Sequence, residues 1–479
     1  MIAATAGLPA ATSQAAEPLA WSPCATTAKG WDPADKLTEC AMLMVPMDYA
    51  DPQGRKIKVA VSRRKATDPA KRRGALVVSP GGPGLKNISA SADYSAGGVA
   101  PYIGQLASDY DLIGLDPRGV GYSDNIDCVD DGPKPLPPTA SAKERAKANW
   151  DDQAAFNQKC TAIDPAFGHQ LTTTNIARDV DSLRAALGES KISFYGVSYG
   201  TAVGASYRSL FDGHVDRMWL DSTMPPVMDL AAMDGDLDAF AEHQFDQFVP
   251  WLAQHDAEYH FGAAAGAART ALFALRDQLD KSPRPVNDTF ALTGQWVRDE
   301  FGNEPSGWVT EARDLATVRD GGIPVAAGPV SINSAATRAA FGFQDQPFSN
   351  FVQYNAIFCN EGTGGRDFDQ MWANAQAAAQ KYPATGGRTE FQTWCADWPW
   401  PAQPWHQVKG TSAFQVSGHV DEGTTPYVWA QALHQAAGGA FLSIQDSSHG
   451  SISRIPCGSK LLDFFRNGRT ASGSCPGMS

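Results

Sequence analysis

The sequence predicts an α/β protein whose mostly parallel central sheet carries a large helical insertion before its last two core strands. In the first half of the chain, short apolar runs end at glycine, proline or aspartate, as buried strands do. A helical pattern lies between two of these runs, and strand, helix and strand in this order predict a right-handed parallel crossover. Two more apolar runs follow near the C-terminus, after a long stretch that is rich in alanine, glutamine and tryptophan.

The sheet is expected to begin with an antiparallel hairpin, because residues 40–66 include KIKVAVSRRKA, which alternates apolar and polar residues. The helix before the third parallel strand is predicted from Ile176, Val180 and Leu183, which share one face, and from Gly188, which ends it. Buried parallel strands are predicted at residues 74–82, 110–119, 191–196, 216–222, 412–418 and 440–446.

The long stretch between the fourth and fifth of these strands predicts a mostly helical cap over residues 225–408, since helical spacings recur through it. The core then comprises residues 21–224 and 409–479, and residues 1–20 form an alanine-rich tail. This tail lacks the basic and continuous apolar regions of a signal peptide. We therefore expect a mature N-terminus from which the signal peptide has already been removed.

Composition narrows the range of partners. A chain of 479 residues, 43% of them hydrophobic, can bury a large core. Its formal net charge is −13 and its lysines and arginines are scattered, so no basic track is available for a nucleic acid backbone. No apolar run is long enough to cross a bilayer. We expect a monomer with no nucleic acid partner and no membrane partner.

Eight cysteines occur without a C-x-x-C pair or a Cys/His cluster at zinc spacing, which favours disulfides over a metal site. Disulfides would place the protein in an oxidising compartment and predict secretion. Eight buried free thiols in a cytosolic enzyme are the alternative. The simplest of many connectivities joins sequence neighbours: Cys24 with Cys40, Cys128 with Cys160, Cys359 with Cys395, and Cys457 with Cys475.

The pattern G-x-S-x-G at residues 196–200 makes Ser198 a candidate nucleophile. By itself the pattern is weak, because many matches are plain turns. Here it follows a predicted strand and precedes a predicted helix, and this context holds the serine in a strained turn with its hydroxyl clear of the sheet.

A serine hydroxyl needs a histidine that takes its proton and an acid that orients the histidine. After a strand-turn-helix elbow, these partners follow in the order acid, then histidine, each behind a late strand. Asp421, just past the fifth parallel strand, and His449, just past the sixth, meet both conditions.

Alternatives to these two partners remain open. His419 is closer to Asp421 in sequence, but no further strand would bring it over Ser198. Asp446 could replace Asp421, although it belongs to the strand that carries His449 and would leave DEGTTP without a role. The histidines of the predicted cap are more typical of surface or packing positions.

The oxyanion of acyl transfer needs backbone donors. The amide of Tyr199 is one, because this residue directly follows the nucleophile. The other is expected from the loop after an early strand, where VVSPGGPG at residues 77–84 offers the unhindered amides of Gly81 and Gly82. A tight turn would explain the same residues and is compatible with this role.

Several segments together resemble the secreted bacterial tripeptidyl aminopeptidases, a branch of the proline iminopeptidase-like serine peptidases that has an α/β-hydrolase fold and a TAP-like C-terminal region. The resemblance spans nearly the whole chain. It implies a triad of Ser198, Asp421 and His449, with Gly82 and Tyr199 binding the oxyanion. The segments are SPGGPG, DLIGLDPRGVGYS, FYGVSYGT, and GHVDEGTTP followed by SSHG.

The resemblance also implies a substrate and a reaction. The family removes short peptides, mainly tripeptides, from free N-termini, and some members favour proline beside the scissile bond. We expect a metal-independent and cofactor-independent serine exopeptidase that forms an acyl-enzyme and releases tripeptides or tetrapeptides from peptides or proteins with a free N-terminus. Simple proline iminopeptidases have a histidine before the paired glycines, whereas this chain has Pro80, which favours the tripeptidyl branch.

Three alternative functions remain: a proline iminopeptidase that releases single residues, a carboxylesterase or lipase with the same triad, and a binding protein on an inactive hydrolase fold.

An exopeptidase must hold the ammonium group of its substrate, for which a carboxylate is suited. Glu361 is the first candidate, because it lies beside Cys359 in the cap and the family often has an acidic residue there. Asp221, at the end of the strand before the cap, is the second. Asp116 is expected to fix a loop beside the site.

Overall fold

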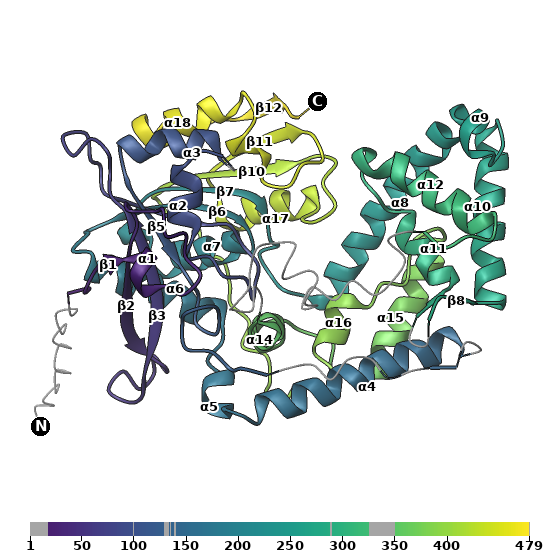
Figure 1. Ribbon diagram of the computed structural model, residues 1–479, viewed down its shortest axis with the longest axis horizontal. Coiled ribbons are helices and arrows are strands. Elements are labelled where there is room, and N and C mark those ends of the chain that lie inside the picture. Colours follow the sequence, from purple (N-terminus) through teal and green to yellow (C-terminus); the bar gives the residue numbers. More distant parts are fainter. Residues whose placement is uncertain are drawn as a thin grey trace, which may run out of the picture.

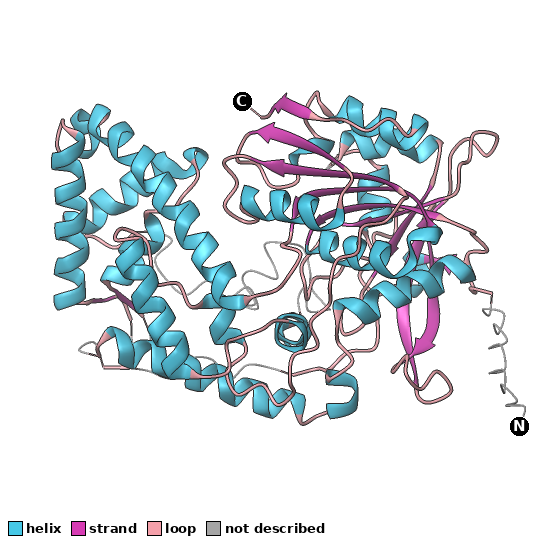
Figure 2. Ribbon diagram, turned by 180° about the vertical axis from the view of Figure 1, so that it is seen from behind, coloured by secondary structure: helices cyan, strands magenta, loops and turns pink. Residues whose placement is uncertain are grey.

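The computed structural model describes residues 18–98, 100–128, 134, 136–137, 140–287, 290–324 and 350–478. Within these residues, a ten-stranded sheet forms the centre of one half of the molecule, and the other half is almost entirely helical (Figure 1). Figure 2 shows that the arrowheads of the parallel strands point toward the helical half. The carboxyl ends of the strands, where ligands bind in parallel sheets, therefore face the cap.

The sheet confirms the predicted fold class. Its order is β1-β2-β3-β5-β4-β6-β7-β10-β11-β12, with antiparallel pairs from β1 to β5 and parallel pairs from there to β12. The last of these strands, which is short and contains glycine and proline, was not predicted. The bounds are β1 Ser22–Pro23, β2 Glu39–Pro46, β3 Lys56–Arg64, β4 Ala75–Ser79, β5 Asp111–Leu115, β6 Ile192–Ser198, β7 Val215–Thr223, β10 Ala413–His419, β11 Ala440–Gln445 and β12 Gly473–Pro476.

Helices cover both faces of the sheet, because strands that are apolar on both sides must be buried on both sides. Along β6, Phe194 packs into the layer on one face and Tyr195 into the layer on the other. The first layer holds α6 (Thr173–Ala186), α7 (Tyr199–Phe211) and α17 (Tyr427–Ala437), and the second holds α2 (Ala90–Ser95), α3 (Pro101–Gly104) and α18 (Gly458–Asn467). Short connecting turns are α1 (Cys24–Thr27), η1 (Gln105–Ser108), α5 (Pro165–Gly168), η2 (Asp212–His214) and η4 (Ser451–Ser453).

The insertion between β7 and β10 has two parts that differ in what they pack against. Its outer part has its own hydrophobic core around Phe245, Phe248 and Leu272. Its inner part, with Phe358 and Phe391, joins the core of the sheet. The elements are α8 (Leu230–Gln254), α9 (Asp256–Tyr259), α10 (Ala265–Lys281), β8 (Arg284–Pro285), β9 (Ala291–Leu292), α11 (Gly294–Glu300), η3 (Pro305–Gly307), α12 (Trp308–Arg319), α14 (Phe351–Glu361), α15 (Phe368–Lys381) and α16 (Glu390–Trp394).

A long helix that the sequence pattern did not predict, α4 (Ala142–Thr161), links the two halves (Figure 1). It begins at a capping box formed by Ser141 and Glu144. It contacts α14, α15 and α16, and its Trp150 packs in a small cluster with Met371 of α15. The cap therefore rests on a helix that comes from the core half of the chain.

All eight cysteines form disulfides, and each pairs with its neighbour in the sequence, as predicted. The bond between Cys359 and Cys395 joins α14 to the end of α16, and the bond between Cys457 and Cys475 joins the start of α18 to β12. In the part of the chain that the structure describes, no helix is both long and apolar enough to cross a membrane.

Candidate active site

Ser198 lies at a strained turn between β6 and α7. It ends the strand, and its backbone has φ 57° and ψ −134°, a conformation that L-residues rarely adopt. The flanking glycines are required by close packing: a Cβ on Gly196 would lie 2.7 Å from the carbonyl oxygen of Gly200, and one on Gly200 would overlap Ser79. The G-x-S-x-G segment therefore holds a half-buried serine at the carboxyl end of the sheet.

His449 follows β11 and lies on a loop that rests against the end of β6. The next residue, Gly450, has φ +63°, and a Cβ there would lie 2.8 Å from Cγ1 of Val197, the residue before the nucleophile. Arg454 holds the loop by donating from Nη2 to the carbonyl oxygen of His449 at 2.7 Å. The loop that carries the predicted histidine thus packs against the residue before the predicted nucleophile.

The carboxylate that reaches His449 belongs to Glu422. Its Oε1 lies 2.5 Å from His449 Nδ1, and its side chain is fully buried. Oε1 also accepts from the amide and hydroxyl of Thr425 at 3.1 and 2.6 Å, and Oε2 accepts from the hydroxyl of Ser222 at 2.8 Å. A carboxylate oxygen only accepts, so Nδ1 carries the proton and Nε2 keeps the lone pair that a general base needs.

The prediction of Asp421 as the acid is corrected by this geometry. The amide of Asp421 donates to the carbonyl oxygen of Asp446 and so extends the pairing of β10 with β11, and its side chain is half-exposed. The chain turns at residues 419–422, where the amide of Glu422 donates to the carbonyl oxygen of His419, and the side chain of Glu422 is buried. DEGTTP offers two adjacent carboxylates, and each is followed three residues later by a threonine, so the local sequence does not distinguish them. In the structure it is Glu422 that accepts two hydrogen bonds, from the amide and the hydroxyl of Thr425.

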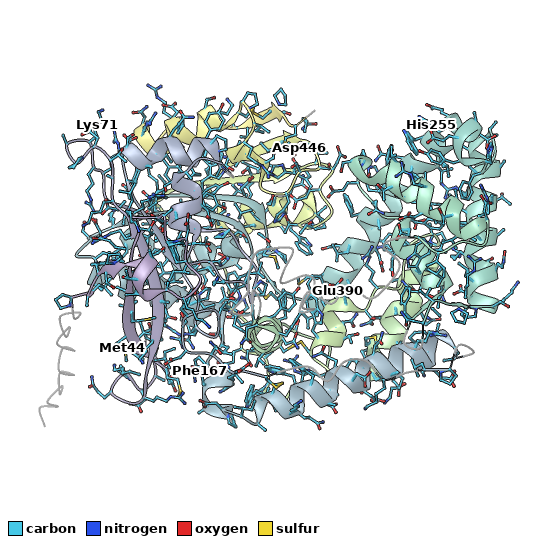
Figure 3. The ribbon with its side chains drawn as sticks, viewed as in Figure 1. Met44, Lys71, Phe167, His255, Glu390 and Asp446 are labelled. Atoms are coloured by element: carbon cyan, nitrogen blue, oxygen red, sulfur yellow. A yellow bond between two sulfur atoms is a disulfide. The ribbon has the colours of Figure 1, made fainter. Side chains whose placement is uncertain are left out.

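A second cluster of one histidine and two carboxylates lies in the sheet beneath the site. His419 is fully buried, with Nδ1 2.6 Å from Asp446 Oδ1 and Nε2 3.0 Å from Asp221 Oδ1. Both ring nitrogens are engaged, so His419 is unavailable to Ser198. Asp446 binds His419 rather than His449. Figure 3 labels Asp446 near the carboxyl end of β11, on the side that faces the cap.

The prediction that Asp221 binds the ammonium group of a substrate is also corrected. Its side chain is fully buried, and besides His419 it accepts from the hydroxyl of Ser417 at 2.5 Å and from the amide of Ile452 at 3.4 Å. Both oxygens of Asp221 are thus engaged within the fold, and none is left for a substrate. Asp221 is a structural partner of His419 because both lie at the buried ends of adjacent strands, β7 and β10.

We expect the protein to lose stability at alkaline pH, because His419 then loses the proton that attracts it to its two carboxylate partners. Burial alone would lower its pKa, but Asp221 and Asp446, with Glu422 at longer range, outweigh burial and raise the pKa from 6.5 to about 10. The protonated His419 therefore makes its full contribution to the free energy of unfolding below pH 6.5, and this contribution is lost as pH rises through 10. We expect the Tm to fall across this range in the wild type and to depend less on pH in His419→Gln.

The matched control for this measurement is His243→Gln, because His243 is exposed on α8. This variant should keep the pH dependence of the wild type. The same alkaline fall in Tm for His419→Gln as for His243→Gln would contradict the assignment.

The loop after β4 reaches the nucleophile through Gly81. This residue has φ +118°, and a Cβ on it would lie 2.7 Å from the Cβ of Ser198, so only glycine fits here. Asn87 Nδ2 donates to the carbonyl oxygen of Gly81 at 2.9 Å, and the Asn87 amide donates to Asp116 Oδ1 at 2.7 Å. Asp116 thus anchors the loop that carries Gly82, and burial raises the pKa of Asp116 to about 6.

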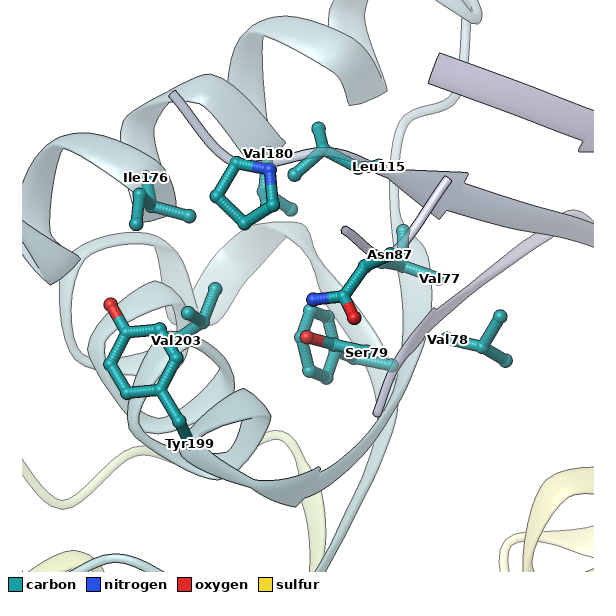
Figure 4. Close-up of a pocket in the computed structure, with 11 residues that line it drawn as sticks. Val77, Val78, Ser79, Asn87, Leu115, Ile176, Val180, Tyr199 and Val203 are labelled. Carbon is teal, nitrogen blue, oxygen red and sulfur yellow. The ribbon is translucent and has the colours of Figure 1, made fainter. Parts of the chain in front are cut away.

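A small cavity lies behind this loop (Figure 4). Ser79, Asn87 and Tyr199 line it together with apolar side chains. Its volume of about 10 Å³ is close to the minimum for one water molecule. It is therefore too small to hold a peptide.

Glu361 ends α14 as a buried carboxylate, with 1% of its surface exposed. Its Oε1 accepts from the amide of Thr174 in the first turn of α6 at 3.1 Å, and its Oε2 has no hydrogen-bond partner among the described residues. Burial raises the pKa of Glu361 to about 7, against hydrogen bonds from Thr173 and Thr174. Thr173 also lies 3.0 Å from the hydroxyl of Tyr199, so Glu361 is close to the residue that follows the nucleophile.

Glu304, a cap residue that the sequence reasoning missed, contacts the turn that carries the acid. It lies between α11 and η3 and accepts from the amide of Gly423 at 2.8 Å. Its side chain is half-buried; burial raises its pKa, and Glu422 raises it further. No local pattern marks Glu304, because only the folded cap brings it to the site.

The sheet, the elbow and the pair of Glu422 with His449 define a serine hydrolase of the α/β-hydrolase class. Residues 74–313 match the family model of the alpha/beta hydrolase fold, and residues 382–475 match that of the TAP-like proteins. The tripeptidyl aminopeptidase of Streptomyces lividans is 31% identical over 94% of this chain and 84% of its own length. The chain belongs to the tripeptidyl aminopeptidase family.

Other relatives match about half of the chain. Serine protease Hip1 of Mycobacterium tuberculosis (strain H37Rv) is 32% identical over 48% of this chain and 45% of its own length. Carboxylesterase B of Mycobacterium tuberculosis (strain CDC 1551) is 33% identical over 44% of this chain and 42% of its own length. The chain is thus similar to both peptidases and an esterase, and its similarity to the tripeptidyl aminopeptidase covers far more of its length.

Proposed function

We propose that this serine peptidase releases tripeptides from the free N-termini of peptides, with Ser198 as nucleophile, His449 as general base and Glu422 as orienting acid. The observation that carries the proposal is the hydrogen bond from His449 Nδ1 to the buried Glu422, on a histidine loop that rests against Val197, the residue before the strained Ser198. The similarity to a tripeptidyl aminopeptidase over 94% of the chain supports the substrate class.

In the proposed mechanism, His449 Nε2 takes the proton of Ser198 Oγ while Oγ attacks the carbonyl carbon of the scissile bond. The oxyanion accepts hydrogen bonds from the amides of Gly82 and Tyr199, and Tyr199 begins α7, whose N-terminus favours negative charge. His449 then gives its proton to the leaving amine as the C–N bond breaks.

The acyl-enzyme formed in this way is hydrolysed by the same groups in reverse roles. His449 takes a proton from water, the resulting hydroxide attacks the ester carbonyl, and the proton returns to Ser198 Oγ as the tripeptide leaves. Glu422 stabilises the imidazolium in both halves of the reaction, because its carboxylate is already held by Thr425 and Ser222 and needs no reorientation.

Recognition of the free amine requires a carboxylate, for which we consider Glu361 and Glu304. We propose Glu361 for this role, because one of its oxygens has no hydrogen-bond partner among the described residues and it lies near Tyr199. Glu304 is the second candidate, because it is more exposed and borders the triad. Glu361→Gln should raise KM for a free tripeptide substrate and leave KM for a short acyl ester, which has no amine, unchanged. If KM for the free tripeptide rises in Glu304→Gln and not in Glu361→Gln, the amine-binding residue is Glu304 instead.

The test of the function is the release of a chromophore from Ala-Ala-Pro, from N-acetyl-Ala-Ala-Pro, from proline alone and from a short acyl ester. We expect the free tripeptide to be cleaved fastest and acetylation to abolish cleavage. Fastest release from proline alone would indicate a proline iminopeptidase. Fastest hydrolysis of the ester, with no effect of acetylation, would indicate a carboxylesterase.

Four disulfides are typical of proteins in oxidising compartments, and we propose that the protein acts outside the cell. Its action as a monomer stays a prediction.

A further inference from the structure

Ser222 is an extra residue in β7, opposite the nucleophile. The strands β6 and β7 pair Val197 with Asp221, but the next residue, Ser198, pairs with Thr223. Ser222 is therefore the extra residue of a β-bulge, and its φ of +53° lies in the left-handed region that favours glycine. A serine in this conformation is strained, so other interactions of the residue must stabilise it there.

The bulge directs the hydroxyl of Ser222 to both partners of the nucleophile. Its Oγ donates to Glu422 Oε2 at 2.8 Å and accepts from the amide of Gly450, the residue after His449, at 2.8 Å. The side chain is fully buried, so water does not compete for these bonds. One hydroxyl thus joins the end of β7 to the acid turn after β10 and to the histidine loop after β11.

The neighbours of Ser222 make no such contacts. The side chain of Asp221 binds His419, and the hydroxyl of Thr223 is buried with no hydrogen-bond partner among the described residues. Regular alternation along β7 would send residue 222 to the face opposite that of its neighbours. The bulge and the positive φ instead aim this residue at the triad.

We propose that Ser222 is a positioning residue of the catalytic triad, which fixes the carboxylate of Glu422 and the backbone after His449 relative to each other. The inference rests on the triad proposed above. Glu422 binds His449 through Oε1 and Ser222 through Oε2, so the second bond stops the carboxylate from rotating away from the imidazole. The bond to Gly450 stops the histidine loop from moving away from the acid.

The conformation of Ser222 allows the hydroxyl to be removed without adding strain. Glycine adopts φ +53° more readily than any other residue, so Ser222→Gly deletes the hydroxyl and relaxes the backbone. Ser222→Ala deletes the hydroxyl and keeps the Cβ at the same φ. We therefore expect Ser222→Gly to have a Tm at or above that of Ser222→Ala, while both lose the same two hydrogen bonds.

The experiment measures kcat and KM of these variants on Ala-Ala-Pro with a chromophoric leaving group. We expect kcat to fall by about 10- to 100-fold in both, because small displacements of catalytic groups have effects of this size. KM should stay within about twofold, because Ser222 does not touch the substrate. The matched control is Thr223→Val, which removes an unbonded buried hydroxyl from the next residue and should keep kcat within about twofold of the wild type.

Two results would overturn the positioning role: wild-type kcat in Ser222→Gly and Ser222→Ala, or an equal loss of kcat in Thr223→Val. Ser198→Ala and Glu422→Gln are measured in parallel. If these two lose activity while the Ser222 variants keep it, the positioning role is wrong and the proposed triad stands. If Ser198→Ala keeps wild-type activity, the triad itself fails and the role of Ser222 fails with it.

Discussion

Ser198→Ala should lower kcat by about a millionfold, because removal of the nucleophile from a serine triad leaves only the contribution of the oxyanion donors and of substrate binding. The affinity for the substrate should change little, since the alanine keeps the backbone amides and removes a single oxygen. The measurement is kcat on the free Ala-Ala-Pro substrate, with binding of the same peptide followed by calorimetry.

Ser206→Ala is the matched control for this variant. Ser206 is buried further along the same helix, α7. It should keep kcat within a few-fold of the wild type. Residual activity of Ser198→Ala near that of Ser206→Ala would show that another residue attacks the substrate.

Glu422→Gln should lower kcat by about 10³- to 10⁴-fold, which is the effect of removing the charge of the acid from a serine triad. The amide can present its nitrogen to His449 Nδ1 and so select the tautomer that cannot take a proton from Ser198. It also leaves the imidazolium without a charged partner. The measurement is kcat at a pH where the wild type has its maximum.

Asp421→Asn makes the same chemical change one residue earlier, and we expect kcat within a few-fold of the wild type. The half-exposed Asp421 has no contact with His449 in the structure, so its charge is screened by solvent. A larger loss in Asp421→Asn than in Glu422→Gln would mean that the turn presents Asp421 to the histidine, as the sequence first indicated.

Most of the sheet could be predicted because buried parallel strands are encoded by short continuous apolar runs. The elements that escaped prediction lack such a signal. In α4 the buried positions include the polar Asn157 and Thr161 beside Trp150, so no clear apolar stripe appears. The last strand, β12, has Cys475 as its buried residue, and glycine and proline at its ends.

Some residues of the candidate site could be predicted from local sequence patterns, and others could not. Ser198 and His449 are marked by local patterns at the ends of predicted strands. The carboxylate that pairs with His449 lies one residue after the predicted Asp421, because the choice between Asp421 and Glu422 depends on where the backbone turns. The hydrogen bonds of Asp221 and Ser222 could not be predicted, since they depend on contacts among the ends of β7, β10 and β11 that exist only in the folded sheet.

Labelling with a fluorophosphonate, followed by mass mapping, tests the triad most directly. The reagent reacts with an activated serine, and trypsin would release residue 198 within the fragment 192–208, between Lys191 and Arg208. We expect one phosphonyl group on Ser198, added much more slowly in Glu422→Gln and at the wild-type rate in Asp421→Asn. A label on any other residue, or no label on the folded wild type, would contradict the proposed triad.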